Sequence, residues 1–137
     1  RGHAAAVIDL RLFLTVGLGA GIGGMLRLLI TQAVVGRVGA GYGQYATLLI
    51  NVSGSFLIGV VVELAQTRAD FHPLWRYFLA TGILGGYTTF STFSYEALTI
   101  ASEGMLWSAA GYVIASVVLG IAAAILGILS VRWFSAV

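Results

Sequence analysis

The sequence predicts an all-α membrane protein with four transmembrane helices, the third of them broken near its middle. Hydrophobic residue types make up 59% of the 137 residues, charged types make up only 9%, and the mean hydropathy is +0.99. Soluble domains usually carry about a quarter charged residues, and a small domain has too much surface to hide such an apolar chain. A water-soluble enzyme is therefore excluded. One proline and no cysteine also exclude a collagen-like chain and a disulfide scaffold.

Four stretches without a charged residue divide the chain, at residues 12–26, 38–62, 77–95 and 104–131. A membrane-spanning helix needs about 20 mostly apolar residues, so we expect one helix around each stretch. The predicted spans are residues 10–35, 45–66, 74–101 and 105–131. Together they make a single four-span membrane domain over residues 1–137, with short connections at 36–44, 67–73 and 103–104.

The first predicted span is rich in glycine. Residues 19–24 match the spacing G-x-G-x-x-G of dinucleotide-binding loops, but that motif has meaning only between a strand and a helix. The same region contains G-x-x-x-G pairs, Gly17 with Gly21 and Gly19 with Gly23, which let helix backbones approach closely in a membrane. We therefore predict a helix-packing surface here and no cofactor site.

The seven basic residues are all arginine, and the formal net charge is +2. They are scattered singly, which excludes a nucleic-acid-binding face and indicates anchors at the membrane surface. Alternation of the spans places most of them on one side: Arg1, Arg11, Arg68, Arg76 and Arg132. Arg37 lies on the other side, with Arg27 if its side chain reaches outward. This count favours both termini in the cytoplasm.

The third span cannot be one straight transmembrane helix. Its 28 residues, 74–101, would extend about 42 Å, whereas the hydrocarbon core is about 30 Å thick. Adjacent glycines followed by β-branched and hydroxyl residues predict an unwound stretch near residues 85–88 between two half-helices. Carbonyl groups freed there can coordinate a cation, or the glycines can simply permit a kink for packing. A dense set of hydroxyl residues favours the ion site: Thr88, Thr89, Ser91, Thr92 and Ser94.

A polar track is predicted beside this break. Phe90 and Phe93 are three residues apart and share a helix face, and the positive edges of their rings can attract an anion that has lost water. Neighbouring hydroxyl groups can replace the lost hydration. Residues spaced by four line one stripe of each adjacent helix: Thr47 with Asn51, and Tyr112 with Ser116. For a single asparagine such as Asn51, an interhelical hydrogen bond is the more common role, but three spans that present donors together favour the polar track.

Two carboxylates receive different interpretations. Glu96 lies deep in the third span, four residues after Thr92, and we expect it to be protonated or paired with Tyr112. Glu63 lies near the end of the second span, and we expect the membrane surface to solvate it. The tripeptide 51–53 matches a glycosylation acceptor, but it lies in an apolar run that no transferase reaches.

Three segments together resemble a known family. They are the run GGYTTFSTFSYE from Gly85 to Glu96, Gly24-Met25-Leu26-Arg27, and Asn51-Val52-Ser53-Gly54, which resemble in order and spacing the Fluc (CrcB) fluoride channels of bacteria. The resemblance implies a fluoride-selective passive channel, not an enzyme, that exports fluoride across the bacterial plasma (inner) membrane. It also implies an antiparallel, dual-topology homodimer with two pores and a central structural sodium ion, although the arginine bias departs from balanced topology.

The resemblance further implies a role for each matching residue. Phe90 and Phe93 resemble the pore aromatics, Asn51 the pore asparagine and Arg27 a vestibule arginine. The other members of the fluoride pore would be Ser91, Thr92, Ser94, Tyr112, Ser116, Thr47 and Glu96. The structural sodium would be held by two backbone carbonyl groups, those of Gly85 and Thr88. The implied partners are fluoride, a second copy of the chain and membrane lipid, with no nucleic acid.

Two other functions fit part of the pattern. A small four-span multidrug or guanidinium-type exporter also forms antiparallel dimers, but it needs a carboxylate inside its first span, and residues 12–26 contain none. A non-transporting assembly subunit would account for the glycine packing, but it has no need of the hydroxyl and phenylalanine cluster. Fluoride release from liposomes without a proton gradient would distinguish the channel from both.

Overall fold

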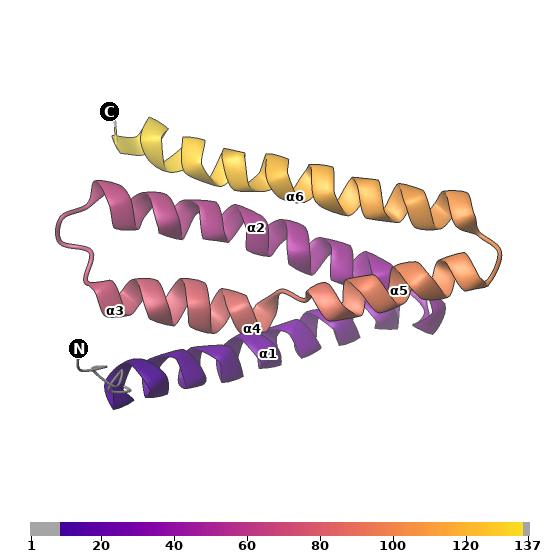
Figure 1. The fold of residues 1–137 in the computed structure, drawn as a ribbon, viewed down its shortest axis with the longest axis horizontal. Helices are drawn as coiled ribbons and strands as arrows, with labels where there is room; N and C mark the ends of the chain where they lie inside the picture. The colour runs from indigo at the N-terminus through magenta and orange to yellow at the C-terminus, as the bar shows by residue number, and fades with distance from the viewer. Residues whose placement is uncertain (1–8, 136–137) are drawn as a thin grey trace, which may run out of the picture.

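The computed structural model describes residues 9–135, and every element in this part of the chain is helical. Four rods lie side by side with alternating direction (Figure 1). Three are long helices, α1 (Leu10–Val38), α2 (Gly43–Thr67) and α6 (Leu106–Ser135), and a short 3-10 helix, η1 (Ala40–Tyr42), joins the first two. The fourth rod consists of consecutive shorter pieces. The predicted all-α class is confirmed.

Local sequence signals set the two ends of α1. The Asp9 carboxylate accepts hydrogen bonds from the backbone N–H groups of Arg11 at 3.0 Å and Leu12 at 3.4 Å, which caps the helix. Gly39 ends it with a φ of 103°, a conformation that glycine adopts at little cost. The helix therefore covers the predicted span of residues 10–35 and continues slightly beyond it.

The broken rod follows α2. Its pieces are α3 (Pro73–Arg76), the π-helix η2 (Tyr77–Leu84), α4 (Gly85–Tyr87) and α5 (Phe90–Ser102). The break itself lies at Thr88 and Thr89, which are extended, with ψ of 159° and 117°. The predicted break is confirmed, but its predicted position at residues 85–88 is mostly wrong, because residues 85–87 are helical.

Close packing explains why glycines precede the break without unwinding. A Cβ atom on Gly86 would overlap the carbonyl oxygen of Ala20 in α1, and one on Gly23 would overlap the carbonyl oxygen of Ile83. Gly19 likewise lies against Gly82, where a Cβ atom would come within 2.9 Å of the Cα. The predicted packing role of Gly19 and Gly23 is therefore confirmed.

The other predicted glycine pair does not pack inside the chain. A Cβ atom on Gly17 or Gly21 would meet nothing within 4 Å, so these residues lie on the outer side of α1. A different pair holds α2 against α6. A Cβ atom on Gly59 would overlap the carbonyl oxygen of Ala124, and one on Gly127 would overlap that of Phe56.

The outer surface of the bundle is apolar. Many large hydrophobic side chains are exposed along α1, α2 and α6, whereas Ile50 is the one large side chain that is fully buried among the described residues. The segments Leu10–Val38, Ala40–Thr67 and Leu106–Ser135 are each long and apolar enough to cross a membrane. Such an apolar surface is stable in contact with lipid tails and unfavourable in contact with water. The chain is therefore an integral membrane protein.

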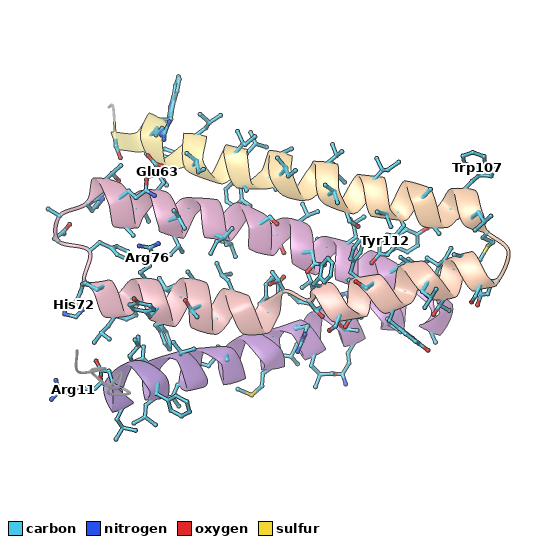
Figure 2. All side chains as sticks on the ribbon, in the orientation of Figure 1. Arg11, Glu63, His72, Arg76, Trp107 and Tyr112 are labelled. Atoms are coloured by element: carbon cyan, nitrogen blue, oxygen red, sulfur yellow. The ribbon has the colours of Figure 1, made fainter. Side chains whose placement is uncertain are left out.

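Figure 2 shows Arg11 and Arg76 near the end of the bundle where α1 begins and α6 finishes. Arg11, Arg68, Arg76 and Arg132 all lie near this end, as predicted, while Arg1 lies outside the described residues. The expectation that Glu63 is solvated here is wrong, because this residue is only 5% exposed. The last turn of α6 brings Arg132 beside it, with Nε 2.8 Å from Oε1 and Nη2 3.3 Å from Oε2.

Candidate functional site

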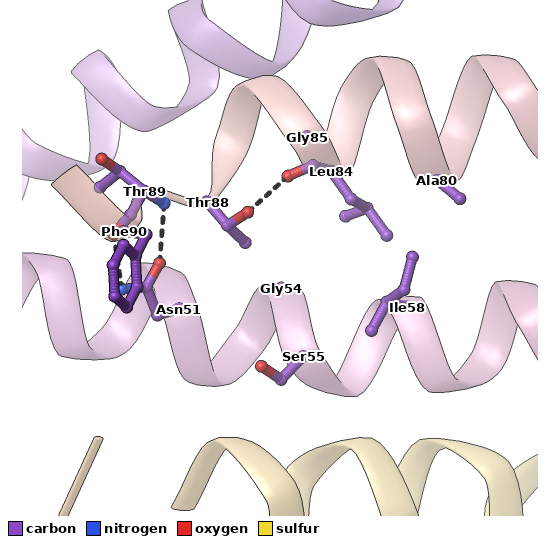
Figure 3. Close-up of a pocket in the computed structure, with 10 residues that line it drawn as sticks. All are labelled: Asn51, Gly54, Ser55, Ile58, Ala80, Leu84, Gly85, Thr88, Thr89 and Phe90. Atoms are coloured by element: carbon purple, nitrogen blue, oxygen red, sulfur yellow. Dashed lines mark hydrogen bonds between the residues drawn. The ribbon is translucent and has the colours of Figure 1, made fainter. Parts of the chain in front are cut away.

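The break is bonded directly to the middle of α2. The Asn51 side chain accepts a hydrogen bond from the Thr89 backbone N–H at 2.9 Å and donates one to the Thr89 carbonyl oxygen at 3.1 Å (Figure 3). Thr89 then caps α5, because its hydroxyl oxygen accepts a hydrogen bond from the Thr92 N–H at 3.3 Å. Both backbone groups of Thr89, one of the two unwound residues, are thus satisfied by a side chain of α2.

Gly54 allows the break to lie this close to α2. A Cβ atom at that position would overlap the Thr88 methyl group and would come within 3.3 Å of the Tyr87 ring. Gly54 follows Asn51 by three residues and faces the same rod. The segment Asn51-Val52-Ser53-Gly54 therefore holds the break against α2, and we call this segment the seat.

A hollow opens on the outer side of this seat, with a volume of about 330 Å³ (Figure 3). It is lined by Asn51, Gly54, Ser55, Ile58, Ala80, Leu84, Gly85, Thr88, Thr89 and Phe90. The structure therefore brings the predicted pore residues Asn51 and Phe90 together with Gly85 and Thr88, the two predicted cation-site residues. Phe90 lies at the edge of the hollow and is 80% exposed.

An aromatic row leads from this hollow toward α6. The ring centroids of Phe90 and Phe93 are 5.8 Å apart with planes at 48°, and those of Phe93 and Tyr112 are 5.3 Å apart with planes at 56°. Tilted rings present edges as well as faces, and ring edges carry partial positive charge. The predicted shared face of Phe90 and Phe93 is confirmed.

Glu96 ties three helices together at the far end of this row. Its Oε1 accepts a hydrogen bond from the Thr47 hydroxyl of α2 at 2.9 Å, and its Oε2 accepts one from the Tyr112 hydroxyl of α6 at 2.7 Å. The predicted pairing of Glu96 with Tyr112 is confirmed. The second cavity, of about 950 Å³, opens beside these groups and is also lined by Tyr42, Tyr45, Tyr95 and Glu103.

The predicted hydroxyl groups are not equivalent. The Ser94 hydroxyl donates to the Phe90 carbonyl oxygen, that of Ser116 to Tyr112, and that of Thr88 to Leu84, at 2.9, 2.7 and 2.9 Å. A serine or threonine has one proton to donate, so these three donors are already in use. Thr89 donates to the Thr92 hydroxyl oxygen at 3.0 Å, so Ser91 is the donor in its 3.4 Å bond to the Thr89 hydroxyl oxygen, and only the proton of Thr92 remains for a ligand.

Arg27 stands apart from this group. It is half-buried on α1 and lines neither of the two cavities. Its implied role as a vestibule arginine stays a prediction.

Sequence reasoning missed one pair at the site. The hydroxyl groups of Tyr87 and Ser53 are 2.8 Å apart, and Tyr87 is only 6% exposed. A tyrosine directly before the break was a signal, because a buried phenol needs a hydrogen-bond partner. Its partner, Ser53, cannot be identified from the sequence, because the sequence does not show which face of α2 lies against the broken rod.

Comparison with known proteins identifies the family. The profile described as CrcB-like protein, Camphor Resistance (CrcB), matches residues 14–128. The chain belongs to the CrcB family. A relative from Granulibacter bethesdensis is 46% identical over 120 residues, covering 88% of this chain and 94% of its own, and one from Solibacter usitatus is 42% identical over 120 residues, covering 88% and 98%. Both, and a Rhizobium meliloti relative at 40% identity covering 87% and 94%, are named fluoride-specific ion channel FluC.

Membership in the CrcB family confirms the resemblance found in the sequence. The matched residues 14–128 include all of α2, the broken rod and the aromatic row, so the seat and the break lie within the family's shared region.

Proposed function

We propose that the chain is a passive, fluoride-selective channel of the bacterial plasma (inner) membrane that lets fluoride leave the cytoplasm and lowers its concentration there. The names of the family relatives support fluoride as the transported ion. The observation that carries the proposal is the row from the Asn51 hollow through Phe90 and Phe93 to Tyr112. Such a channel needs no catalytic group and no energy source.

The chemistry of this row suits a small dehydrated anion. Asn51 uses one of its two amide protons on Thr89, so the second N–H remains for an anion in the hollow. The edges of Phe90 and Phe93 supply weak positive charge, and the Thr92 hydroxyl supplies a donor. Few and weak ligands permit entry without trapping, which conduction requires.

A second copy is proposed to complete the pore. Phe90 is 80% exposed and the hollow is open on its outer side, so one subunit encloses no conduit in the part of the chain described. We propose an antiparallel, dual-topology homodimer in which the broken rod also crosses the membrane. Each subunit would then contribute one aromatic row, which makes two separate pores.

A structural sodium ion is proposed at the centre of that dimer. None of the hydrogen bonds formed outside the helices in residues 9–135 uses the carbonyl oxygen of Gly85 or Thr88. Both residues line the hollow that the second copy would cover. Free carbonyl oxygens at a helix break are the groups that bind sodium in membrane proteins, so these residues fit the ion. When bound, it would offset the cost of moving an anion into a low-dielectric interior.

Fluoride efflux from liposomes tests the proposed function. Purified protein is reconstituted into vesicles loaded with potassium fluoride, and release is started with valinomycin in the absence of a proton gradient. We expect rapid fluoride release, with matched chloride-loaded vesicles silent. Chloride release at a similar rate would contradict selectivity, and organic-cation exchange driven by protons would favour the exporter instead.

A further inference from the structure

Two hydrogen-bonded bridges hold the break on α2, and we call them together the break clamp. The first joins the Asn51 amide to both backbone groups of Thr89, and the second joins the hydroxyl groups of Ser53 and Tyr87. The two bridges bind the residues on either side of Thr88, Tyr87 and Thr89. The free carbonyl group of Thr88 therefore lies between two residues that are each held in place by α2.

The first bridge sets the direction of the Thr88 carbonyl. Thr89 is extended, with φ of −150° and ψ of 117°, so its N–H and C=O point to the same side and meet one amide group. The peptide bond between Thr88 and Thr89 is planar and trans, which makes the Thr88 C=O point opposite to the Thr89 N–H. Since that N–H points at Asn51, the Thr88 carbonyl oxygen points away from it.

The second bridge anchors the residue before Thr88. The Ser53 hydroxyl lies 2.7 Å from the Leu49 carbonyl oxygen and donates its proton there, so the phenol of Tyr87 is the donor in the 2.8 Å bond. The Tyr87 ring is buried beside Gly54, and the backbone nitrogen of Tyr87 lies against Gly23 of α1. A stiff side chain held at its base and its tip restricts the backbone of its own residue.

We infer that Tyr87 and Ser53 are positioning residues that, with Asn51, orient the backbone carbonyls of the break as cation ligands. The inference rests on the sodium site of the proposed function. Tyr87 and Ser53 line neither cavity, so any effect they have on the ion must pass through the backbone. The clamp also couples the proposed fluoride path to the proposed sodium site. Asn51 lines the hollow, and it also fixes the orientation of the peptide group between Thr88 and Thr89.

Sodium binding by the full-length protein in nanodiscs tests the inference without relying on transport. Hydrogen–deuterium exchange of the segment 85–90 is followed while sodium chloride replaces N-methylglucamine chloride. In Tyr87→Phe the sodium concentration for half-maximal protection should rise about three- to tenfold, the effect of one net hydrogen bond. Tyr77→Phe is the matched control, because that tyrosine is 42% exposed and should not shift the midpoint.

A second variant uses the asymmetry of the bridge. Ser53→Ala removes the acceptor and leaves a buried phenol without a partner, whereas Tyr87→Phe leaves Ser53 bonded to Leu49. An orphaned buried donor is the costlier defect, so Ser53→Ala should raise the midpoint more, and the double variant should return to the Tyr87→Phe value. That rescue is specific to the bridge and would not follow from general loosening.

The possible outcomes separate this inference from the proposed function. Raised midpoints with rescue support it even if the wild-type protein releases no fluoride, in which case the proposed function alone fails. Unchanged midpoints in both single variants overturn it even if fluoride flux is normal. Purely additive losses in the double variant, or sodium-independent exchange in the wild type, also overturn it.

Discussion

The helix α2 has two sides that differ in kind. On one side it meets α6 through interlocked glycines, Gly59 and Gly127, and through the Glu63–Arg132 ion pair. On the other side it holds the break through amide and hydroxyl bonds beside an open hollow. The first contact is tight at these two glycines, and the second is polar and incomplete in one subunit.

The comparison indicates that the side of α2 that meets α6 serves stability, and that the side that holds the break serves function. Backbones in close contact gain dispersion energy and leave no room for a ligand. A seat built from directed hydrogen bonds fixes an irregular backbone and keeps groups available at its edge. Changes on the α6 side should therefore lower stability, whereas changes on the break side should alter transport. The following variants test that division, from the largest expected effect to the smallest.

Phe90→Ile should abolish fluoride release. It removes the ring edges at the hollow but keeps a large apolar side chain, and the 80% exposure of Phe90 means that the fold of the subunit depends little on it. Liposome efflux measures the loss, and size-exclusion chromatography checks the assembly. Phe13→Ile, at a residue 66% exposed on α1, is the control and should conduct normally. Wild-type release from Phe90→Ile would remove the ring from the pore.

Asn51→Asp should reduce fluoride release about a hundredfold, which corresponds to a barrier raised by about 2.7 kcal/mol. The aspartate oxygen can still accept the Thr89 N–H, but nothing remains to donate to the Thr89 carbonyl oxygen, and a carboxylate faces the anion. The same efflux assay measures the rate. If throughput were unaltered, the hollow beside Asn51 would not lie on the path of the ion.

Gly127→Ala should lower stability and leave selectivity unchanged. Its methyl group would overlap the Phe56 carbonyl oxygen, and pushing α2 and α6 apart should lower the free energy of unfolding by about 2 kcal/mol. Thermal unfolding in detergent measures it. Gly111→Ala on the same helix meets nothing within 4 Å and should be neutral or slightly stabilising. Equal unfolding midpoints for Gly127→Ala and Gly111→Ala would show that the close contact between α2 and α6 contributes nothing to the stability of the fold.

Glu63→Gln should give the smallest effect, a slightly lower unfolding midpoint with normal fluoride release. The amide keeps the size of the side chain but loses the charge that pairs with Arg132, whose side chain is largely exposed. Glu103→Gln, at an exposed carboxylate after α5, is the control for charge alone. Impaired release with an unchanged midpoint would place Glu63 on the functional side of the division.

The break shows how far sequence reasoning reached. The excess length of residues 74–101 predicted an interruption correctly, because membrane thickness sets a limit on a straight helix. Its position was misplaced toward the glycines, since propensity cannot reveal that Gly86 is needed for contact with Ala20. The unwound residues are instead Thr88 and Thr89, held extended by Asn51, a residue 38 positions away from Thr89 in the chain.

Glu63 and the hydroxyl residues show the same limit. The position of Glu63 near the end of the second span predicted solvation at the membrane surface. Its carboxylate is instead paired with Arg132, which follows it by 69 residues in the chain. The hydroxyls of Ser94, Ser116 and Thr88 counted as donors in the sequence, yet each is bonded to a carbonyl within its own rod. Counting polar residues does not reveal which protons remain free.

The amino-acid sequence by itself determined the membrane setting, the four helical rods, the interrupted third rod and the family, because these depend on composition, length and short motifs. Only the tertiary structure decided where the backbone unwinds, which glycines touch another helix and which donors remain unbonded. Those properties depend on contacts between residues far apart in the chain. The direction of a carbonyl at the break is set by a side chain on another helix, and no local pattern encodes that.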